Sequence, residues 1–106
     1  MANRFAEMIN CETPTLVDFS AEWCGPCKIM KPILDDLKSK MGDNCRIIKV
    51  DVDKNPQAAN DYQIQGVPTL ILFQKGEIKW RQSGVVQAIE LKQIIERFLL
   101  DRKPQQ

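Results

Sequence analysis

The sequence predicts an α/β fold in three layers, in which a mixed β-sheet lies between helices. Stretches with apolar residues at helical spacing alternate with short apolar runs typical of buried strands. The order is helix, strand, helix, strand, helix, two strands and helix, and the helical crossovers allow parallel pairing. With 106 residues, 43% hydrophobic and 27% charged, the chain has the size and composition of one globular domain. We expect that domain to span residues 1–106, with a polar tail over about 101–106.

A short helix and a buried strand are expected first. Residues 3–9 are weakly amphipathic and predict a helix at the edge of the domain. After Pro14, residues 16–19 form a compact apolar run that is typical of a buried strand. Asp18 is the exception within this run, and alternation alone favours a solvent-facing position for it as much as a buried one.

A long helix is predicted to begin within the segment Trp23–Cys27. Its apolar residues recur at helical spacing, and Gly42 is placed to end it. Pro32 lies inside the pattern and should kink the helix. The apolar positions are Ile29, Ile33, Leu34, Leu37 and Met41.

The second half of the chain continues the alternation. Residues 45–52 predict a second strand, and Asn55 and Pro56 predict the N-cap and first residue of a short helix that ends before Gly66. Two antiparallel strands over 69–73 and 77–82 are joined by a turn at residues 75–76 and followed by Gly84. A last helix is marked by apolar residues between 89 and 99.

Charge and hydropathy exclude several classes of function. Fifteen Lys and Arg nearly balance fourteen Asp and Glu, and a net charge of +1 without a basic run is not that of a nucleic-acid-binding or membrane-surface protein. No stretch approaches the roughly 20 apolar residues of a membrane span. The balanced charge leaves proteins or small molecules as the expected partners. Residues 1–15 lack the apolar core of a secretory signal, so we expect a cytoplasmic location.

Chemistry is indicated by Cys24 and Cys27, three residues apart where a strand gives way to a helix. We expect the first sulfur to be exposed at the helix start and the second to lie one turn inside. Unpaired amides and the helix dipole favour a thiolate at Cys24. That thiolate can attack a disulfide, and Cys27 can then resolve the mixed disulfide.

Two other interpretations of the pair are an inert pair and half of a zinc site. Four cysteines are too few for a disulfide scaffold. Zinc takes four ligands, and without histidine the set would have to include Cys11 and Cys45, which lie on different predicted elements. A Cys-X-X-Cys segment that follows a strand and opens a helix favours redox chemistry over both.

The sequence closely resembles the thioredoxin family over essentially the whole chain. Trp-Cys-Gly-Pro-Cys followed later by Val-Pro-Thr is highly specific for that family. The matching segments are residues 16–19, 21–28 with Pro32, 49–53, 55–56, 66–70, Phe73, 76–77 and Gly84. The resemblance implies the thioredoxin fold and a thiol-disulfide oxidoreductase that reduces protein disulfides.

The resemblance also implies roles for the residues around the cysteines. Cys24 becomes the attacking cysteine and Cys27 the resolving one. Asp18 is implied to lie buried beneath the pair, where burial raises its pKa enough for it to accept a proton from Cys27. Lys49 is implied to modulate Asp18 electrostatically, although an isolated strand lysine is more often only solvated.

Substrate binding is implied around Pro68, whose peptide bond is cis in thioredoxins although most X-Pro bonds are trans. The backbone of Val67 is then free to hydrogen-bond an extended substrate chain, as an added strand does. The resemblance implies a shallow apolar rim from Trp23, Gly25, Pro26, Val67 and Gly84. Gly25 and Pro26 also tune the potential and favour a reductant.

Three residues depart from the family pattern or add to it. Ser20 occupies a position where many thioredoxins have tryptophan, which should loosen the packing there. Cys45 is expected to be a small buried hydrophobic residue. Cys11, in a loop, is a candidate oxidation-sensitive thiol.

The implied partners are disulfide-containing proteins and an NADPH-dependent flavoprotein thioredoxin reductase, and the chain is expected to be a monomer. Ribonucleotide reductase, peroxiredoxin and methionine sulfoxide reductase are targets typical of the family. No cofactor is expected, because the dithiol carries the electrons. Two alternative functions remain: a disulfide oxidase or isomerase of the same fold, and a thioredoxin-fold binding subunit that does not need its thiols.

Overall fold

The computed structural model describes residues 4–101 and has the predicted order of elements. A short 3₁₀ turn at Gly42–Asn44 separates the second helix from the second strand. In chain order the helices and strands are α1 (Arg4–Ile9), β1 (Thr15–Ser20), α2 (Gly25–Met41), β2 (Arg46–Asp51), α3 (Pro56–Asp61), β3 (Thr69–Gln74), β4 (Glu77–Ser83) and α4 (Ala88–Asp101).

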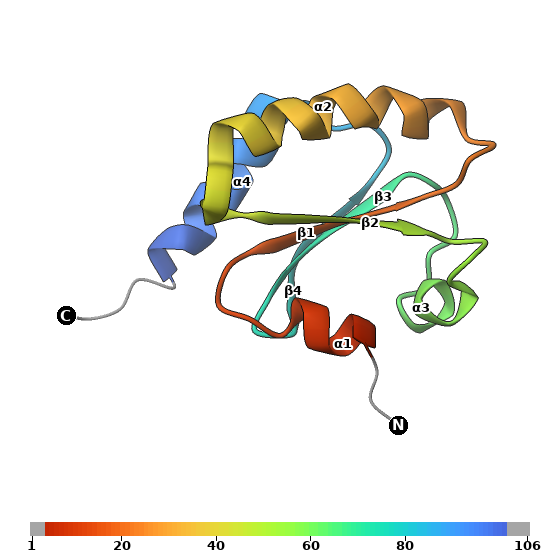
Figure 1. Cartoon of the computed structure of the whole chain (residues 1–106), viewed down its shortest axis with the longest axis horizontal. Helices are drawn as coiled ribbons and strands as arrows, with labels where there is room; N and C mark the ends of the chain where they lie inside the picture. The colour runs from red at the N-terminus through yellow and green to blue at the C-terminus, as the bar shows by residue number, and fades with distance from the viewer. Residues whose placement is uncertain (1–3, 102–106) are drawn as a thin grey trace.

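The four strands form one mixed sheet in the order β2-β1-β3-β4. β1 pairs with β2 in parallel, and β3 is antiparallel to both β1 and β4. Helices α2 and α4 cover one face, and α1 and α3 cover the other (Figure 1). The predicted three-layer α/β fold is therefore confirmed.

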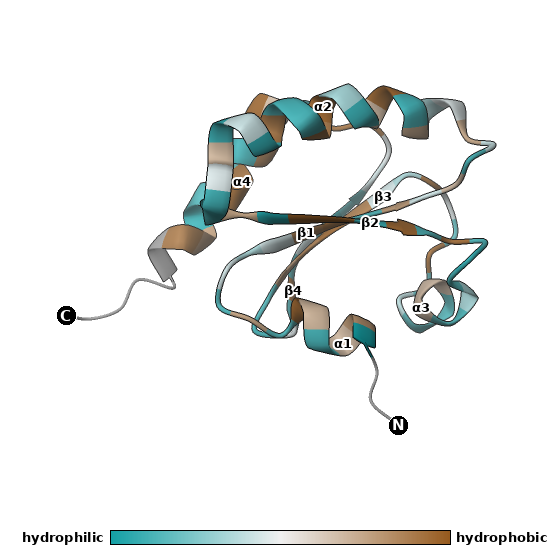
Figure 2. Ribbon diagram, viewed as in Figure 1, coloured by the Kyte–Doolittle hydropathy of each residue, from teal (hydrophilic) through white to brown (hydrophobic). Residues whose placement is uncertain are grey.

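Each face of the sheet has its own apolar core. Alternation along β1 directs Leu16 toward the α2/α4 cluster, and Val17 and Phe19 toward the α1/α3 cluster. Because helices cover both faces, all six residues of β1 and all six of β3 are buried. The hydropathy colouring shows the same arrangement, with apolar stretches along the central strands (Figure 2).

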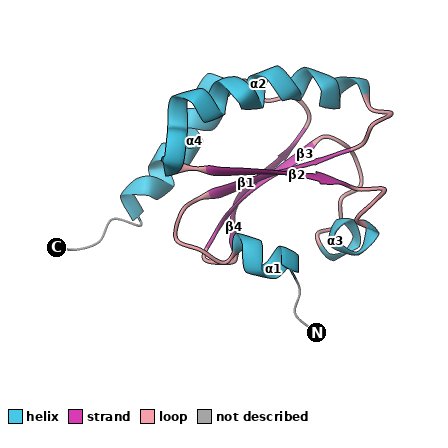
Figure 3. Cartoon of the chain, in the orientation of Figure 1, coloured by secondary structure: helices cyan, strands magenta, loops and turns pink. Residues whose placement is uncertain are grey.

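The two ends of α2 explain why the chain turns where it does. Gly42 caps the C-terminus with a φ of 57°, in the left-handed region that favours glycine, and its N–H donates to the Lys38 carbonyl. Pro32 lies inside the helix, which continues past it to Met41. The loops that follow β1 and β2 lie at the same end of the sheet (Figure 3), so the start of α2 and the segment before α3 share that end.

Some details differ from the sequence prediction. Asn55 is the N-cap residue of α3 and Pro56 its first residue, as predicted, but the Asn55 side chain makes no capping hydrogen bond: its Nδ2 donates to the Asp51 carbonyl at 3.0 Å. Asp101 belongs to α4 and not to a tail, and residues 102–106 lie outside the described residues. Within residues 4–101, no helix combines the length and apolarity needed to cross a membrane.

Candidate functional site

The cysteine pair lies at the start of α2 and is joined by a disulfide, with the two Cα atoms 5.3 Å apart. Cys24 is the N-cap residue of the helix, and its Sγ accepts a hydrogen bond from the Cys27 N–H at 3.1 Å. Pro26 fits the first turn because a backbone N–H there would have no helical partner. The predicted strand-to-helix position of the pair is confirmed.

The exposure predicted for Cys24 is wrong. Cys24 is 4% exposed and Cys27 5%, because both pack with Ala21 into a small cluster bordered by Val52 and Val67. The Cys24 Sγ lies 3.5 Å from the Val67 carbonyl oxygen. This is a contact in the disulfide, whose sulfur has no proton, and it becomes a donor–acceptor pair once Cys24 is a thiol.

Asp18 is buried below the pair, with 2% of its surface exposed. The solvent-facing alternative is therefore wrong, because alternation places Asp18 on the face of Leu16, which α2 covers. No described residue hydrogen-bonds its Oδ1. A cavity of about 170 Å³ touches Asp18 together with Cys27 and Lys49. The acid and the second cysteine thus share one small space.

Burial sets the ionisation of Asp18. It raises the pKa of this carboxyl from 3.8 to about 6, and the charge of Lys49 opposes the rise. Lys49 is the direct partner of Asp18 in the β1–β2 register, with its side chain exposed. Near neutral pH the carboxyl is therefore poised to exchange a proton.

The loop before β3 lies against the pair. The Val67–Pro68 bond is cis, as the resemblance implies. The Gly84 N–H donates to the Pro68 carbonyl at 2.8 Å, with Gly84 at a φ of 96° that a side chain rarely allows. Among the described residues, nothing hydrogen-bonds the N–H of Val67. That donor is available to a bound chain.

Trp23 borders the pair on the surface and is 70% exposed. Its Nε1 donates to Asp53 Oδ2 at 2.8 Å, which fixes the indole. Sequence reasoning assigned Asp53 no role, and only its place directly after a strand could have suggested one. A hollow of about 110 Å³ runs between Trp23 and Val67. Gly25 and Pro26 are exposed at the helix start.

The remaining cysteines differ in environment. Cys45 is fully buried, as predicted, and burial raises its pKa to about 11. Burial also acts to raise the pKa of Cys11, but hydrogen bonds from Thr15 and Arg46 outweigh it, and the net pKa is lowered.

Ser20 is buried, and its carbonyl accepts a hydrogen bond from the Val52 N–H. Within residues 4–101, no group of three Cys, Asp or Glu is placed to hold a metal ion, so the zinc interpretation lacks a ligand set there.

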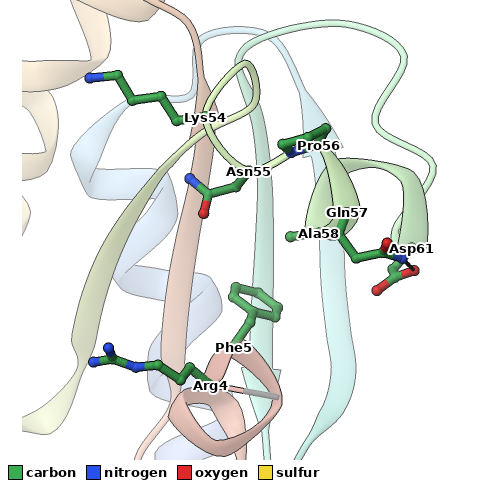
Figure 4. Close-up of a pocket in the computed structure, with 8 residues that line it drawn as sticks. All are labelled: Arg4, Phe5, Lys54, Asn55, Pro56, Gln57, Ala58 and Asp61. Carbon is green, nitrogen blue, oxygen red and sulfur yellow. Dashed lines mark hydrogen bonds between the residues drawn. The ribbon is translucent and has the colours of Figure 1, made fainter. Parts of the chain in front are cut away.

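A larger hollow, about 380 Å³, lies elsewhere, between α1 and the start of α3. Arg4 and Phe5 contribute from α1, and the other lining residues belong to α3 and the loop before it (Figure 4). It contains no cysteine, and its acid Asp61 is bound by Gln57 of the same helix. The redox chemistry is therefore assigned to the smaller hollows around Cys24 and Cys27.

A cysteine pair that can form a disulfide at the start of a helix, close to a buried acid, is suited to exchange disulfides with other thiols. The protein is a thiol-disulfide oxidoreductase. The family model described as Thioredoxin matches residues 1–97, and the chain belongs to that family.

The relatives agree with this assignment. The chain is 46% identical over 96 residues to a thioredoxin-like protein of Synechocystis, covering 90% of this chain and 91% of that protein. It is 42% identical to Thioredoxin Y2, chloroplastic, of Arabidopsis thaliana, covering 92% of this chain and 59% of that one. A mutant thioredoxin from Halobacterium salinarum superposes with a TM-score of 0.82 at 32% identity, covering 93% and 87% of the two chains. These relatives do not favour a binding subunit or an oxidase.

Proposed function

We propose that this chain reduces disulfides in other proteins, with Cys24 as the attacking sulfur and Cys27 as the resolving one. The observation that carries the proposal is the Cys24–Cys27 bond at the start of α2, which shares a cavity with the buried Asp18, whose Oδ1 has no hydrogen-bond partner among the described residues. The first sulfur caps the helix, where backbone N–H groups and the helix dipole favour a thiolate.

The reaction runs in two exchanges. The Cys24 thiolate attacks one substrate sulfur, a bond forms between them, and the second substrate sulfur leaves as a thiolate. Cys27 then loses its proton and attacks Cys24, so the Cys24–Cys27 bond forms and the first substrate sulfur leaves. Two electrons pass from the protein dithiol to the substrate, which takes up two protons and becomes a dithiol.

Asp18 is the proposed proton acceptor for Cys27. Both line the same cavity of about 170 Å³, and a water there can connect them. A pKa near 6 leaves the carboxyl largely ionised at pH 7, yet basic enough to take a proton. Lys49, its register partner, is proposed to keep that pKa from rising further.

The substrate is proposed to bind as an extended chain along Val67. The free N–H of Val67 and the hollow beside Trp23 favour backbone pairing with an apolar contact. Gly84 supports Pro68 through its hydrogen bond, and Gly25 and Pro26 leave the rim open and tune the potential.

The oxidised pair must be reduced after each turnover. We propose an NADPH-dependent flavoprotein thioredoxin reductase as the electron source, and a monomeric protein, because the pair and its acid come from one chain. We also propose a reducing location, the cytoplasm. The thiols Cys11 and Cys45 favour a compartment in which free thiols persist, while the chloroplastic relative belongs to another compartment.

The test is dithiothreitol-driven reduction of insulin by the intact protein beside Cys24→Ser, Cys27→Ser and the control Cys11→Ser. We expect rapid turnover in the intact protein and the control, none in the two site variants, and a trapped mixed disulfide only in Cys27→Ser. Turnover no faster than dithiothreitol alone sinks the proposal and favours a binding subunit. A measured reduction potential separates a reductase from an oxidase or isomerase.

A further inference from the structure

A second hollow of about 270 Å³ borders the cysteine pair and shares no lining residue with the one beside Trp23. It is lined by Cys27 and Ala21, one acid, Glu22, and three lysines: Lys28, Lys31 and Lys49. Lys28 and Lys31 come from the first turns of α2, and Lys49 comes from β2. Two separate elements thus bring cationic side chains to the side of the second cysteine.

Three lysines face one acid in this hollow, and nearby acids offset part of the excess positive charge: Asp35 pairs with Lys31, and Asp18 interacts electrostatically with Lys49. Among the described residues, neither Lys28 nor Lys49 forms an ion pair, and both are exposed. Lys31 pairs with Asp35 at 3.2 Å, but both side chains are about 70% exposed. Glu22 pairs with Lys54, which does not line the hollow, at 3.7 Å. The chain as a whole is only +1, so this concentration of charge is local.

We propose that this hollow binds acidic side chains that flank the disulfide of a substrate protein. The inference rests on the proposed function and narrows its substrate class. The substrate sulfur bonds to Cys24, whose Cα lies 5.3 Å from that of Cys27, and Cys27 lines the hollow, so substrate residues beside that sulfur come within reach of the lysines. Aspartate or glutamate there meets Lys28 and Lys31, while lysine or arginine is repelled.

The exposure of these lysines sets the size of the expected preference for acidic substrates. Exposed ion pairs stabilise weakly, so removing two lysines should change selectivity by about 2- to 10-fold and not abolish activity. Salt should weaken the preference, since the screening length falls from about 10 Å at 0.1 M to about 3 Å at 1 M. Both features distinguish charge recognition from a loss of catalysis.

The experiment compares kcat/KM for three disulfide peptides that differ only in acidic, neutral or basic flanks. The test variant is Lys28→Gln/Lys31→Gln, and the matched control is Lys40→Gln/Lys92→Gln. The control removes the same charge from α2 and α4, at lysines that each pair with an acid four residues away, as Lys31 does. Lys40 lies nine residues beyond Lys31, about 14 Å along the helix. We expect the intact protein and the control to favour the acidic peptide, and the test variant to lose most of that preference.

Equal kcat/KM for all three peptides, with the intact protein still active, overturns this inference and leaves the proposed function standing. The same holds if the control loses the preference as fully as the test variant. Absence of turnover with every peptide overturns the proposed function. If there is no turnover, binding is measured by NMR with the acidic peptide carrying serine in place of cysteine. Shifts of the Lys28 and Lys31 amide signals would support the docking site, and their absence would overturn this inference as well.

Discussion

The two faces of the sheet are built differently. On the α1/α3 face, Phe5, Phe19, Tyr62 and Phe73 form a cluster with ring centroids 5.3 to 6.2 Å apart. The buried residues of the α2/α4 cluster are aliphatic or sulfur-containing, with Trp80 and Phe98 packed at its border. This face also includes Asp18, whose Oδ1 has no hydrogen-bond partner among the described residues. One face contributes stability, and the other gives some up at Asp18, the proposed proton acceptor.

The largest effect should come from the aromatic face. Phe73→Ala removes a fully buried ring that contacts both Phe5 and Tyr62, and should lower the free energy of unfolding by about 3–5 kcal/mol. Urea unfolding of the oxidised protein measures it. Ile78→Ala, at a residue 48% exposed, is the control and should change stability by less than about 0.5 kcal/mol. Similar losses in both variants would contradict the division of the faces.

Asp18→Asn should do the opposite and stabilise the protein at neutral pH. Because the folded pKa of about 6 lies above the ordinary 3.8, the folded state binds the proton more tightly than the unfolded one. The destabilisation caused by the charged Asp18 carboxylate is absent below about pH 4, grows as the pH rises, and is complete above about pH 6. The difference of about two pKa units corresponds to about 3 kcal/mol.

Urea unfolding of Asp18→Asn and the intact protein from pH 4 to pH 8 checks this sign. The gap between their free energies of unfolding should be largest at pH 8 and should vanish at pH 4. Asp35→Asn, at an exposed acid lining the same cavity, is the control and should show almost no gap. A gap that does not vary with pH would show that Asp18 does not titrate as described.

The two free thiols also lie on different faces. Cys45 packs in the α2/α4 core, while Cys11 contacts Arg46, which also binds the Met8 carbonyl of α1. At pH 8, the raised pKa of about 11 makes the Cys45 thiolate about 100-fold rarer than that of an ordinary thiol of pKa 9.0. Cys11 should react with iodoacetamide more than 100-fold faster than Cys45, as measured by mass spectrometry of the oxidised protein. Comparable rates would mean that the α2/α4 face opens readily.

The smallest effect is expected for Lys49→Gln. Its positive charge lowers the pKa of Asp18, so its removal should raise that pKa above about 6. Because the Lys49 side chain is exposed, its interaction with the Asp18 carboxylate should contribute no more than about 1 kcal/mol. The pH profile of insulin reduction should move to higher pH, and Lys40→Gln should leave it in place. A shift to lower pH would contradict the assigned role.

Most of the fold was predictable because each element carries its own signal. The periodicity of α2, its closing Gly42 and the apolar strands all depend on nearby residues. The burial of Asp18 did not follow from alternation alone, which places it opposite Val17 and Phe19; it was implied by the family resemblance, and the helices on both faces of the sheet account for it.

The missed features of the site depend on residues far apart in sequence. Cys24 is covered by Val67, 43 residues away, which no local pattern reveals. The lysine hollow combines α2 with β2, and Asp53 reaches Trp23 across 30 residues. Asn55 occupies the predicted N-cap position of α3, but its side chain makes no capping hydrogen bond, and its Nδ2 donates to the Asp51 carbonyl.

The sulfur that caps α2 is also one of the two that form the disulfide and is the proposed attacking sulfur, so redox state and helix stability are thermodynamically linked. The Cys27 N–H donates to Cys24 Sγ, and a thiolate accepts such a bond more strongly than a disulfide sulfur does. Each turnover therefore tightens and loosens the first turn of α2. By thermodynamic reciprocity, a substitution that stabilises this turn more in the thiolate form than in the disulfide form shifts the redox equilibrium toward the reduced protein. The size of that shift equals the difference between the two stabilisation free energies.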